Sequence, residues 1–263
     1  MSGGCVSEVV SVQAHGHEPL VAKFDRLSTL EEEAYGLQAL AETATVRVPR
    51  VIGVHGDDGG GVLLLEKLQV GGAGNWSEFG EDLASLHQVD VGERYGFDRD
   101  NHLGPTPQRN GWYEDWRRFN QERRHGPLVD QLEARGTLTG SAAKLVHEAI
   151  RAFEEVLPAC PKPSLLHGDL WSGNALALSD GSVAVIDPAP SVGDGLADIA
   201  MMQLFGGFPA ECFRAYAQSR GIELSEPQLA AYRLYHMLNH LLIFGSGYLG
   251  AVQKEAAIVR GAI

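Results

Sequence analysis

The sequence has few cysteines and no long apolar run. Its three cysteines, Cys5, Cys160 and Cys212, are spaced too widely for a disulfide framework or a zinc site. No apolar stretch approaches the roughly 18 residues that a membrane-spanning helix needs, and the first residues do not resemble a signal peptide. We therefore expect no membrane contact and a cytoplasmic protein in a reducing compartment.

Positive charge is also scarce. Against 34 aspartates and glutamates there are only 21 lysines and arginines, which gives a formal net charge of −13. This balance argues against a nucleic-acid partner and against an anionic membrane surface. A bound nucleotide would have to be held by local cations and metal ions. The 263 residues are enough for one large core or two modest lobes.

One stretch combines the side chains that a phosphoryl-transfer centre needs. Asp169 is followed five residues later by Asn174, and Asp187 ends the apolar run 183–186. Phosphoryl transfer from ATP needs a carboxylate that accepts the proton of the acceptor hydroxyl, and metal ions over the phosphate oxygens. The spacing predicts Asp169 as the base, with Asn174 and Asp187 as oxygen ligands for Mg²⁺. The alternative, a purely structural turn at 167–169, leaves the second aspartate unexplained.

The first 70 residues are predicted to form a small nucleotide-binding lobe. Gly3 and Gly4 precede a predicted strand, and their amides could lie against phosphates, although a plain flexible terminus is the alternative. Lys23 ends a Val-Ala-Lys strand similar to the kinase strand whose lysine contacts the α- and β-phosphates. The stretch 63–68, which includes Glu66, is predicted as the hinge that meets adenine.

Residues 71–263 are predicted to form a second, mainly helical lobe, so the fold class is α+β. Helical periodicity starts at Trp76, and 92–110 reads as an irregular loop. Four kinds of side chain are interpreted as structural or solvent-exposed. These are the packing histidine His87, the helix-capping Asp198, the exposed arginines Arg117, Arg118, Arg123 and Arg124, and the solvated glutamates Glu31 and Glu32.

Assembled in this way, the chain resembles the fructosamine kinase (ketosamine-3-kinase) family, a relative of aminoglycoside and choline phosphotransferases with a protein-kinase-like fold. The most specific match is the run His-Gly-Asp-Leu-Trp-Ser-Gly-Asn at 167–174. Further matches cover nearly the whole chain, at 2–8, 21–23, 33–37, 96–101, 110–112, 186–188, 204–208, 238–241 and 244–248.

The resemblance implies a two-lobe fold, with a small antiparallel sheet and one helix beside a larger helical lobe. It also implies ATP- and Mg²⁺-dependent phosphorylation of the sugar 3-hydroxyl of a small ketosamine or glycated amine, including glycated protein lysines. Glu33 would hold Lys23 at the nucleotide. Trp171 is expected to form a wall for the sugar, and His240 to reach the acceptor; for both residues simple packing is the alternative.

Three other functions stay open at this point. The acceptor could be another amine-bearing molecule, such as an aminoglycoside or choline. The chain could bind nucleotide without turnover, because Met1 directly precedes the glycine turn where family members usually have a further strand. We therefore expect a small lobe without its first strand. A metal-dependent hydrolase built on His167 and Asp169 ranks last, since it leaves Lys23 unexplained.

Cys5 follows the two glycines, where amide dipoles could lower the pKa of its thiol. We expect it to be the most oxidant-sensitive cysteine and to be able to join two chains, which gives a monomer or a redox-dependent dimer. The alternative is a small apolar filler under the sheet.

Overall fold

The computed structural model describes residues 7–13, 16 and 18–263. The predictions for Gly3, Gly4 and Cys5 therefore lie outside the described residues.

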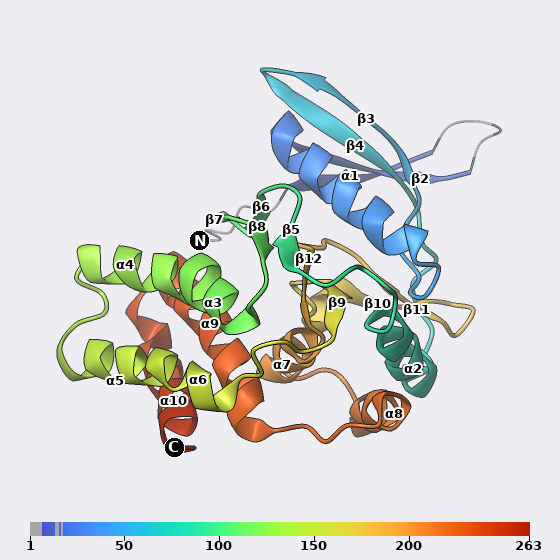
Figure 1. Cartoon of the computed structure of the whole chain (residues 1–263). Helices are drawn as coiled ribbons and strands as arrows, with labels where there is room; N and C mark the ends of the chain where they lie inside the picture. The colour runs from blue at the N-terminus through green and yellow to red at the C-terminus, as the bar shows by residue number, and fades with distance from the viewer. Residues whose placement is uncertain (1–6, 14–15, 17) are drawn as a thin grey trace.

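The described chain begins with a four-stranded antiparallel sheet that packs on one helix (Figure 1). Helix α1 (Leu27–Glu42) is inserted between the second and third strands, and Leu30, Leu37 and Leu40 on one of its faces are fully buried. This confirms the predicted small sheet with one helix. In spatial order the strands are β1 (Glu8–Val12), β2 (Leu20–Asp25), β4 (Gly60–Glu66) and β3 (Val51–Asp57).

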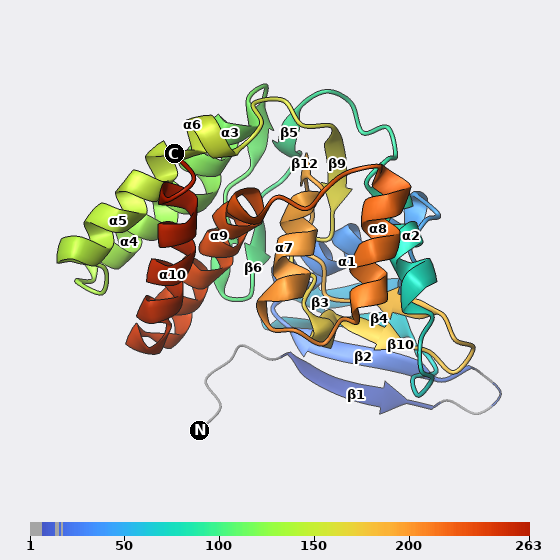
Figure 2. The same ribbon diagram turned by 90° about the horizontal axis from the view of Figure 1, so that it is seen from below.

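The remainder of the chain is mainly helical, as predicted, and the helices α7, α9 and α10 pack side by side (Figure 2). Because β4 ends at Glu66 and the next helix begins at Trp76, the predicted lobe boundary near residue 70 falls between them and stays a prediction. The helices are α2 (Trp76–Leu86), α3 (Trp116–Phe119), α4 (Gly126–Ala134), α5 (Gly140–Arg151), α6 (Phe153–Val156), α7 (Leu196–Leu204), α8 (Ala210–Arg220), α9 (Glu226–Phe244) and α10 (Leu249–Arg260), with a π-helical turn (Asn120–His125) and two 3-10 turns (Ser172–Asn174 and Ser246–Tyr248).

Short strands carry the functional loops between these helices. The prediction of an irregular loop at 92–110 was wrong, since glycine and proline there separate strands of three residues that are too short to give a periodic pattern. A four-stranded sheet has the order β8 (Gly111–Tyr113), β5 (Tyr95–Phe97), β12 (Ser191–Asp194), β9 (Pro163–Leu166). Two hairpins pair β6 (Asn101–Leu103) with β7 (Thr106–Gln108), and β10 (Ala175–Ala177) with β11 (Val183–Val185).

One of the four arginines predicted to be exposed is buried. The guanidinium of Arg124 donates to Asn110 Oδ1 at 2.7 Å and to the carbonyl oxygen of Arg109 at 3.2 Å. It also lies over the ring of Phe119, 4.5 Å from the centroid. The π-helical turn that contains Arg124 changes which side chains face inward, and the sequence carries no signal for such a turn. Within the described residues, no helix is both long and apolar enough to cross a membrane.

Helices α2 and α8 approach each other closely at Gly80. A Cβ at this position would lie 2.3 Å from the carbonyl oxygen of Cys212, so only a glycine fits between the two backbones. Gly80→Ala should therefore destabilise the protein by roughly 1–3 kcal/mol through overpacking. Urea unfolding would measure this difference.

Gly250 provides the matched control, because it lies in helix α10 and a Cβ there would meet nothing within 4 Å. Gly250→Ala should leave stability unchanged or raise it by up to about 1 kcal/mol. Equal losses in both variants would contradict close packing at Gly80.

Candidate active site

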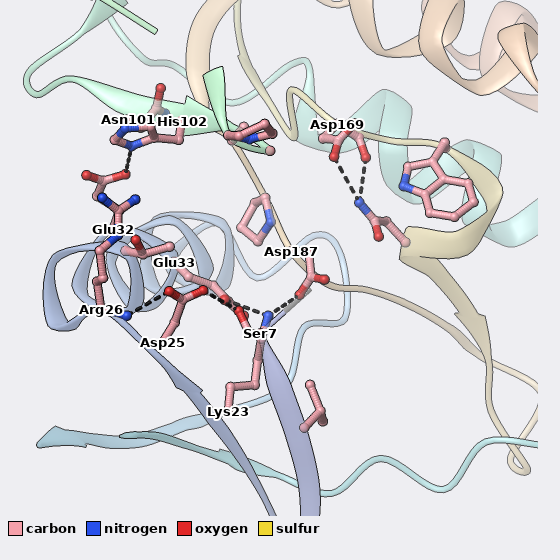
Figure 3. Close-up of a pocket in the computed structure, with 18 residues that line it drawn as sticks. Ser7, Lys23, Asp25, Arg26, Glu32, Glu33, Asn101, His102, Asp169 and Asp187 are labelled. Atoms are coloured by element: carbon pink, nitrogen blue, oxygen red, sulfur yellow. Dashed lines mark hydrogen bonds and ion pairs between the residues drawn. The ribbon is translucent and has the colours of Figure 1, made fainter. Parts of the chain in front are cut away.

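A cleft of about 610 Å³ opens between the small sheet and the helical lobe (Figure 3). Its walls come from β2 and α1 on one side, and from the β6–β7 hairpin, the loop after β9 and the segment after β11 on the other. The cleft therefore brings together the two parts of the sequence in which site residues were predicted.

The ammonium group of Lys23 joins the two walls of the cleft. It donates to Glu33 Oε2 at 2.6 Å and to Asp187 Oδ1 at 2.8 Å (Figure 3). Burial opposes the charge of Lys23, but the two carboxylates outweigh this effect and raise its pKa. Burial also raises the pKa of Glu33 to about 7, against the opposing charge of Lys23. The structure thus brings together Lys23, Glu33 and Asp187, three of the residues that the sequence predicted for nucleotide and metal.

Close packing fixes helix α1 relative to Asp187. Gly36 lies one helical turn after Glu33, and a Cβ there would be 3.0 Å from Pro188 Cγ and 3.1 Å from Pro190 Cδ. Without a side chain at this position, the helix backbone rests directly on the two proline rings. Asp187 itself has a φ of +54°, which is rare for a residue with a side chain and is typical of functional sites.

The loop after β9 presents Asp169 through a turn that requires glycine. Gly168 has a φ of +83°, and a Cβ there would lie 2.0 Å from the carbonyl oxygen of Ala189. His167 is buried and donates through Nε2 to the carbonyl oxygen of Ile186 at 2.9 Å, while its Nδ1 accepts from the amide of Asp169 at 3.3 Å. Since both ring nitrogens bind backbone, His167 shapes the loop, and a hydrolase built on this histidine is not supported.

Asp198, on helix α7, binds the backbone of the same loop. It is not the helix cap that the sequence predicted. Its carboxylate accepts the amide hydrogens of His167 at 2.7 Å and of Gly168 at 2.9 Å. His87 Nε2 donates to it at 3.2 Å, so the packing histidine predicted at 87 orients Asp198. The first amide of α7 is bound instead by Asp194 Oδ1, at 3.0 Å from Leu196 N. The helical pattern of the sequence could not show that Asp198 binds the amide of Gly168, which lies 30 residues earlier in the chain.

Asp169 is held by Asn174, as the five-residue spacing suggested. Asn174 Nδ2 donates to the backbone oxygen of Asp169 at 2.9 Å and to its Oδ2 at 3.4 Å (Figure 3). Burial, together with the negative charges of Asp187 and Asp198, raises the pKa of Asp169 to about 7. A carboxyl group with this pKa can accept a proton near neutral pH.

The oxygens left over by these contacts suit a magnesium ion. Asn174 binds Asp169 through its nitrogen, and Asp187 binds Lys23 through Oδ1, which leaves one side-chain oxygen on each residue for a ligand. No group of three or more His, Cys, Asp or Glu side chains in the described part of the chain could enclose a metal by itself. Two protein oxygens fit Mg²⁺, which usually completes its shell with water and substrate phosphates.

Trp171 lies in the wall of the cleft and is 40% exposed. Its ring packs on Gly173, where a Cβ would be only 2.2 Å from the indole Cη2 atom. The Trp-Ser-Gly run of the sequence therefore specifies one position of the indole beside Asp169. The indole of Trp171, which the sequence analysis expects to form a wall for the sugar, therefore lies in the same cleft as Asp169.

Two predicted site residues lie away from the cleft wall. Glu66 binds the guanidinium of Arg47 and accepts from the amide of Arg50 at 3.1 Å, which lowers its pKa despite partial burial. The backbone contact to adenine predicted for this hinge stays a prediction. His240 donates through Nδ1 to the carbonyl oxygen of His236 at 2.8 Å and packs among aromatic rings.

A contact that the sequence did not predict joins the two walls of the cleft. Glu32, interpreted as solvent-exposed, binds His102 Nδ1 of the β6–β7 hairpin at 2.7 Å (Figure 3). Close by, Tyr35 donates to Asp98 Oδ2 at 2.8 Å. The prediction for Glu32 was wrong because helical periodicity shows which face of α1 meets the sheet, but not that its other face meets the large lobe.

Solved structures of aminoglycoside phosphotransferases share this architecture. One of them matches with a TM-score of 0.67 at 17% identity, over 100% of this chain and 93% of the other. At this identity the likeness concerns the fold alone, and it confirms the predicted protein-kinase-like, two-lobe class.

Closer relatives define the family. A family model described as fructosamine kinase matches residues 1–259. A "probable ketoamine kinase" from Synechocystis is 36% identical, over 97% of this chain and 87% of the relative. The protein-ribulosamine 3-kinase of Arabidopsis thaliana is 34% identical over 94% and 78%, respectively. The crystal structure of a candidate fructosamine-3-kinase from Haemophilus somnus has a TM-score of 0.87 at 28% identity, over 98% of this chain and 89% of the other. The chain belongs to the fructosamine kinase family.

The raised pKa of Asp169 predicts that Asp169→Asn lowers the activity of the protein but raises its stability. If Asp169 is the base, Asp169→Asn should reduce turnover by at least about a hundredfold. The same change removes a buried carboxylate whose folded-state pKa, about 7, exceeds the unfolded value. Ionisation of this group disfavours the folded state increasingly as pH rises from about 4 to 7. Asp169→Asn should therefore stabilise the protein at pH 8, by at most roughly 4 kcal/mol, and less at pH 5.

Urea unfolding at the two pH values measures this effect, and Asp130→Asn, at an exposed position, is the control. A variant at 169 that is less stable than wild type at pH 8 would contradict the assignment of a destabilising carboxylate.

Proposed function

We propose that this protein is an ATP- and Mg²⁺-dependent kinase that phosphorylates the 3-hydroxyl of the sugar in a ketosamine. The observation that carries the proposal is the cleft in which the pair Asp169 and Asn174 faces the ion cluster of Lys23, Glu33 and Asp187. Membership of the fructosamine kinase family supports the choice of acceptor.

In this proposal different side chains of the cleft bind the nucleotide, accept the proton and hold the metal ion. Lys23, kept charged and in place by Glu33, binds phosphate oxygens of ATP at one wall of the cleft. Asp169 accepts the proton of the acceptor hydroxyl, and the hydrogen bond from Asn174 keeps its carboxylate oriented. Mg²⁺, held by oxygens of Asn174 and Asp187, would neutralise charge on the transferred phosphoryl group.

Trp171 gives the acceptor an apolar wall beside Asp169. A sugar presents C–H bonds on the faces of its ring, and an indole packs against such a face. The partners are therefore small ketosamines or glycated amines, including glycated lysine side chains of proteins. A relative that is 34% identical is named for ribulosamine, so the five-carbon sugar is as suitable as the six-carbon one.

Two other functions compete with this one. Aminoglycoside phosphotransferases share the fold, which makes another amine-bearing acceptor the nearest alternative. Binding of nucleotide without turnover is the second alternative.

An assay of ADP release over fructosyl-lysine, ribosyl-lysine, choline and kanamycin discriminates among these functions. We expect Mg²⁺-dependent turnover with the first two acceptors only, because they carry the ketosamine 3-hydroxyl. Turnover of kanamycin or choline alone would support the alternative acceptor. Nucleotide binding with no turnover of any acceptor would contradict the proposal.

Asp187→Ala should separate the metal role from the base role. Loss of this carboxylate removes one Mg²⁺ ligand and one partner of Lys23. We expect weaker nucleotide binding in the presence of Mg²⁺, by about tenfold or more, and a smaller difference between Mg²⁺ and EDTA. Titration with a fluorescent ATP analogue measures both.

Asp25→Ala is the matched control, since Asp25 also lines the cleft but binds Ser7 Oγ at 2.7 Å and the amide of Arg26. This variant should keep the full dependence on Mg²⁺. An unchanged Mg²⁺ effect in Asp187→Ala would remove Asp187 from the metal site.

We also propose the cytosol as the place of action and a monomer as the basic unit. The free thiols of Cys160 and Cys212 are in keeping with a reducing compartment. A dimer linked through Cys5 stays a prediction.

A further inference from the structure

Four aromatic side chains gather where helix α9 ends. His240 lies near the centre of this group, with ring centroids 5.0 Å from Phe205, 5.4 Å from Phe244 and 5.1 Å from Tyr248. Phe244 and Tyr248 are also 5.8 Å apart. We call Phe205, His240, Phe244 and Tyr248 the aromatic cluster. The fold brings it together from three stretches that matched the family pattern, 204–208, 238–241 and 244–248, and the proposed reaction gives no role to these side chains.

Local backbone geometry builds the cluster. His240 and Phe244 are four residues apart on α9, so they lie on the same face of the helix. Gly245, with a φ of +85°, ends the helix and turns the chain into the 3-10 turn that carries Tyr248 back to His240. Phe205 comes from the opposite side, directly after α7, which packs along α9 (Figure 2).

The cluster is not buried in the core. Phe205 and Phe244 are 45% and 53% exposed. A single exposed aromatic residue needs no explanation, but two that share one cluster with further rings form a surface suited to a ligand.

Two sets of contacts place the cluster beside the acceptor side of the cleft. Gly207, two residues after Phe205, packs on Ser172, which follows Trp171 in the wall of the cleft; a Cβ at 207 would lie 2.4 Å from Ser172 Cβ. On the other side, Asn239 accepts from Thr106 Oγ1 at 2.5 Å. Thr106 follows the tip of the β6–β7 hairpin, which also lines the cleft. The segments that carry the cluster are therefore joined, through Gly207 and Asn239, to the segments that carry Trp171 and this hairpin.

The protonation of His240 determines what the cluster can bind. A carbonyl oxygen only accepts hydrogen bonds, so His240 Nδ1, 2.8 Å from the oxygen of His236, carries the proton. Burial lowers the pKa of His240, which keeps the ring neutral at pH 7. Its Nε2 atom is then a hydrogen-bond acceptor, and the neighbouring ring faces attract positive charge.

We propose that the aromatic cluster binds the protonated amine of the ketosamine, through ring faces and His240 Nε2, and so selects acceptors that carry a basic nitrogen. The inference rests on the proposed function and adds how the protein recognises the amine of its acceptor. In a ketosamine the nitrogen is attached to C1, the carbonyl carbon is C2, and the 3-hydroxyl is on C3. The nitrogen and the 3-hydroxyl are therefore on opposite sides of the carbonyl group. With that hydroxyl at Asp169 and the sugar against Trp171, the nitrogen and its substituent point away from the phosphates. Aromatic faces also accept alkyl chains of different length, so free amines and lysine side chains would both fit.

The test compares two acceptors that differ in charge at one atom. One is fructose with a butylamino group at C1, and the other is fructose with a butoxy group at C1, which is neutral. Phe205→Leu and Phe244→Leu keep an apolar side chain but remove the ring face. Each should raise the KM for the amine about fivefold, the scale of one exposed cation–π contact. The KM for the ether, kcat and the KM for ATP should stay within about twofold.

Trp112→Leu is the matched control, because Trp112 is also 40% exposed but lies on β8, with the guanidinium of Arg94 5.3 Å from its ring centroid. It should change neither KM. Circular dichroism and the unfolding midpoint of each variant establish that it is folded. Equal increases in KM for the amine and the ether, or no increase for either, would overturn the proposal while the kinase function stands. If wild type phosphorylates neither acceptor, the proposed function fails and the inference with it.

Discussion

The arrangement of the two lobes depends on one buried cation. Lys23 is the link between Glu33 on α1 and Asp187 at the end of the β11 segment, and both contacts are shorter than 3 Å. A buried ammonium without partners would lose its proton or leave the interior, so the cluster forms only when sheet, helix and large lobe meet. This dependence makes the ion cluster a measure of whether the cleft is assembled.

Negative charge is concentrated at the other wall, where Asp169 and Asp187 line the cleft and Asp198 is buried behind the loop that carries Asp169. Burial opposes ionisation of Asp198, but hydrogen bonds from His87 and the loop amides outweigh this effect and lower its pKa. Burial and the charges of Asp187 and Asp198 raise the pKa of Asp169, against a weak hydrogen bond from Asn174. The same residue type is thus a fixed anion in one place and a proton acceptor in the other, which is how acid–base sites are commonly tuned.

Sequence reasoning anticipated the structure of the candidate site where this structure depends on neighbours along the chain. The spacing of Asp169 and Asn174, the Val-Ala-Lys strand and the periodicity of α1 all report local geometry. Asp198, Glu32 and Arg124 were misinterpreted because their partners lie 30, 70 and 14 residues away, respectively, and helical or turn patterns do not encode such distances. Their roles needed the tertiary structure, in which a carboxylate on α7 reaches the loop of Asp169 and a glutamate on α1 reaches the β6–β7 hairpin.

The contact of Gly36 with Pro188 and Pro190 has a mechanical consequence. Gly36 follows Glu33 by one turn, and Pro188 follows Asp187 directly, so the contact lies next to both carboxylates that hold Lys23. Proline rings are rigid, and Gly36 has no side chain that could change its rotamer to make room for them. Helix α1 therefore has no free space on this side, so it cannot move closer to the Asp187 segment without displacing a proline ring. The distance between Glu33 and Asp187, and with it the space left for the Lys23 ammonium group, has a lower limit that is set by backbone packing and not by charge.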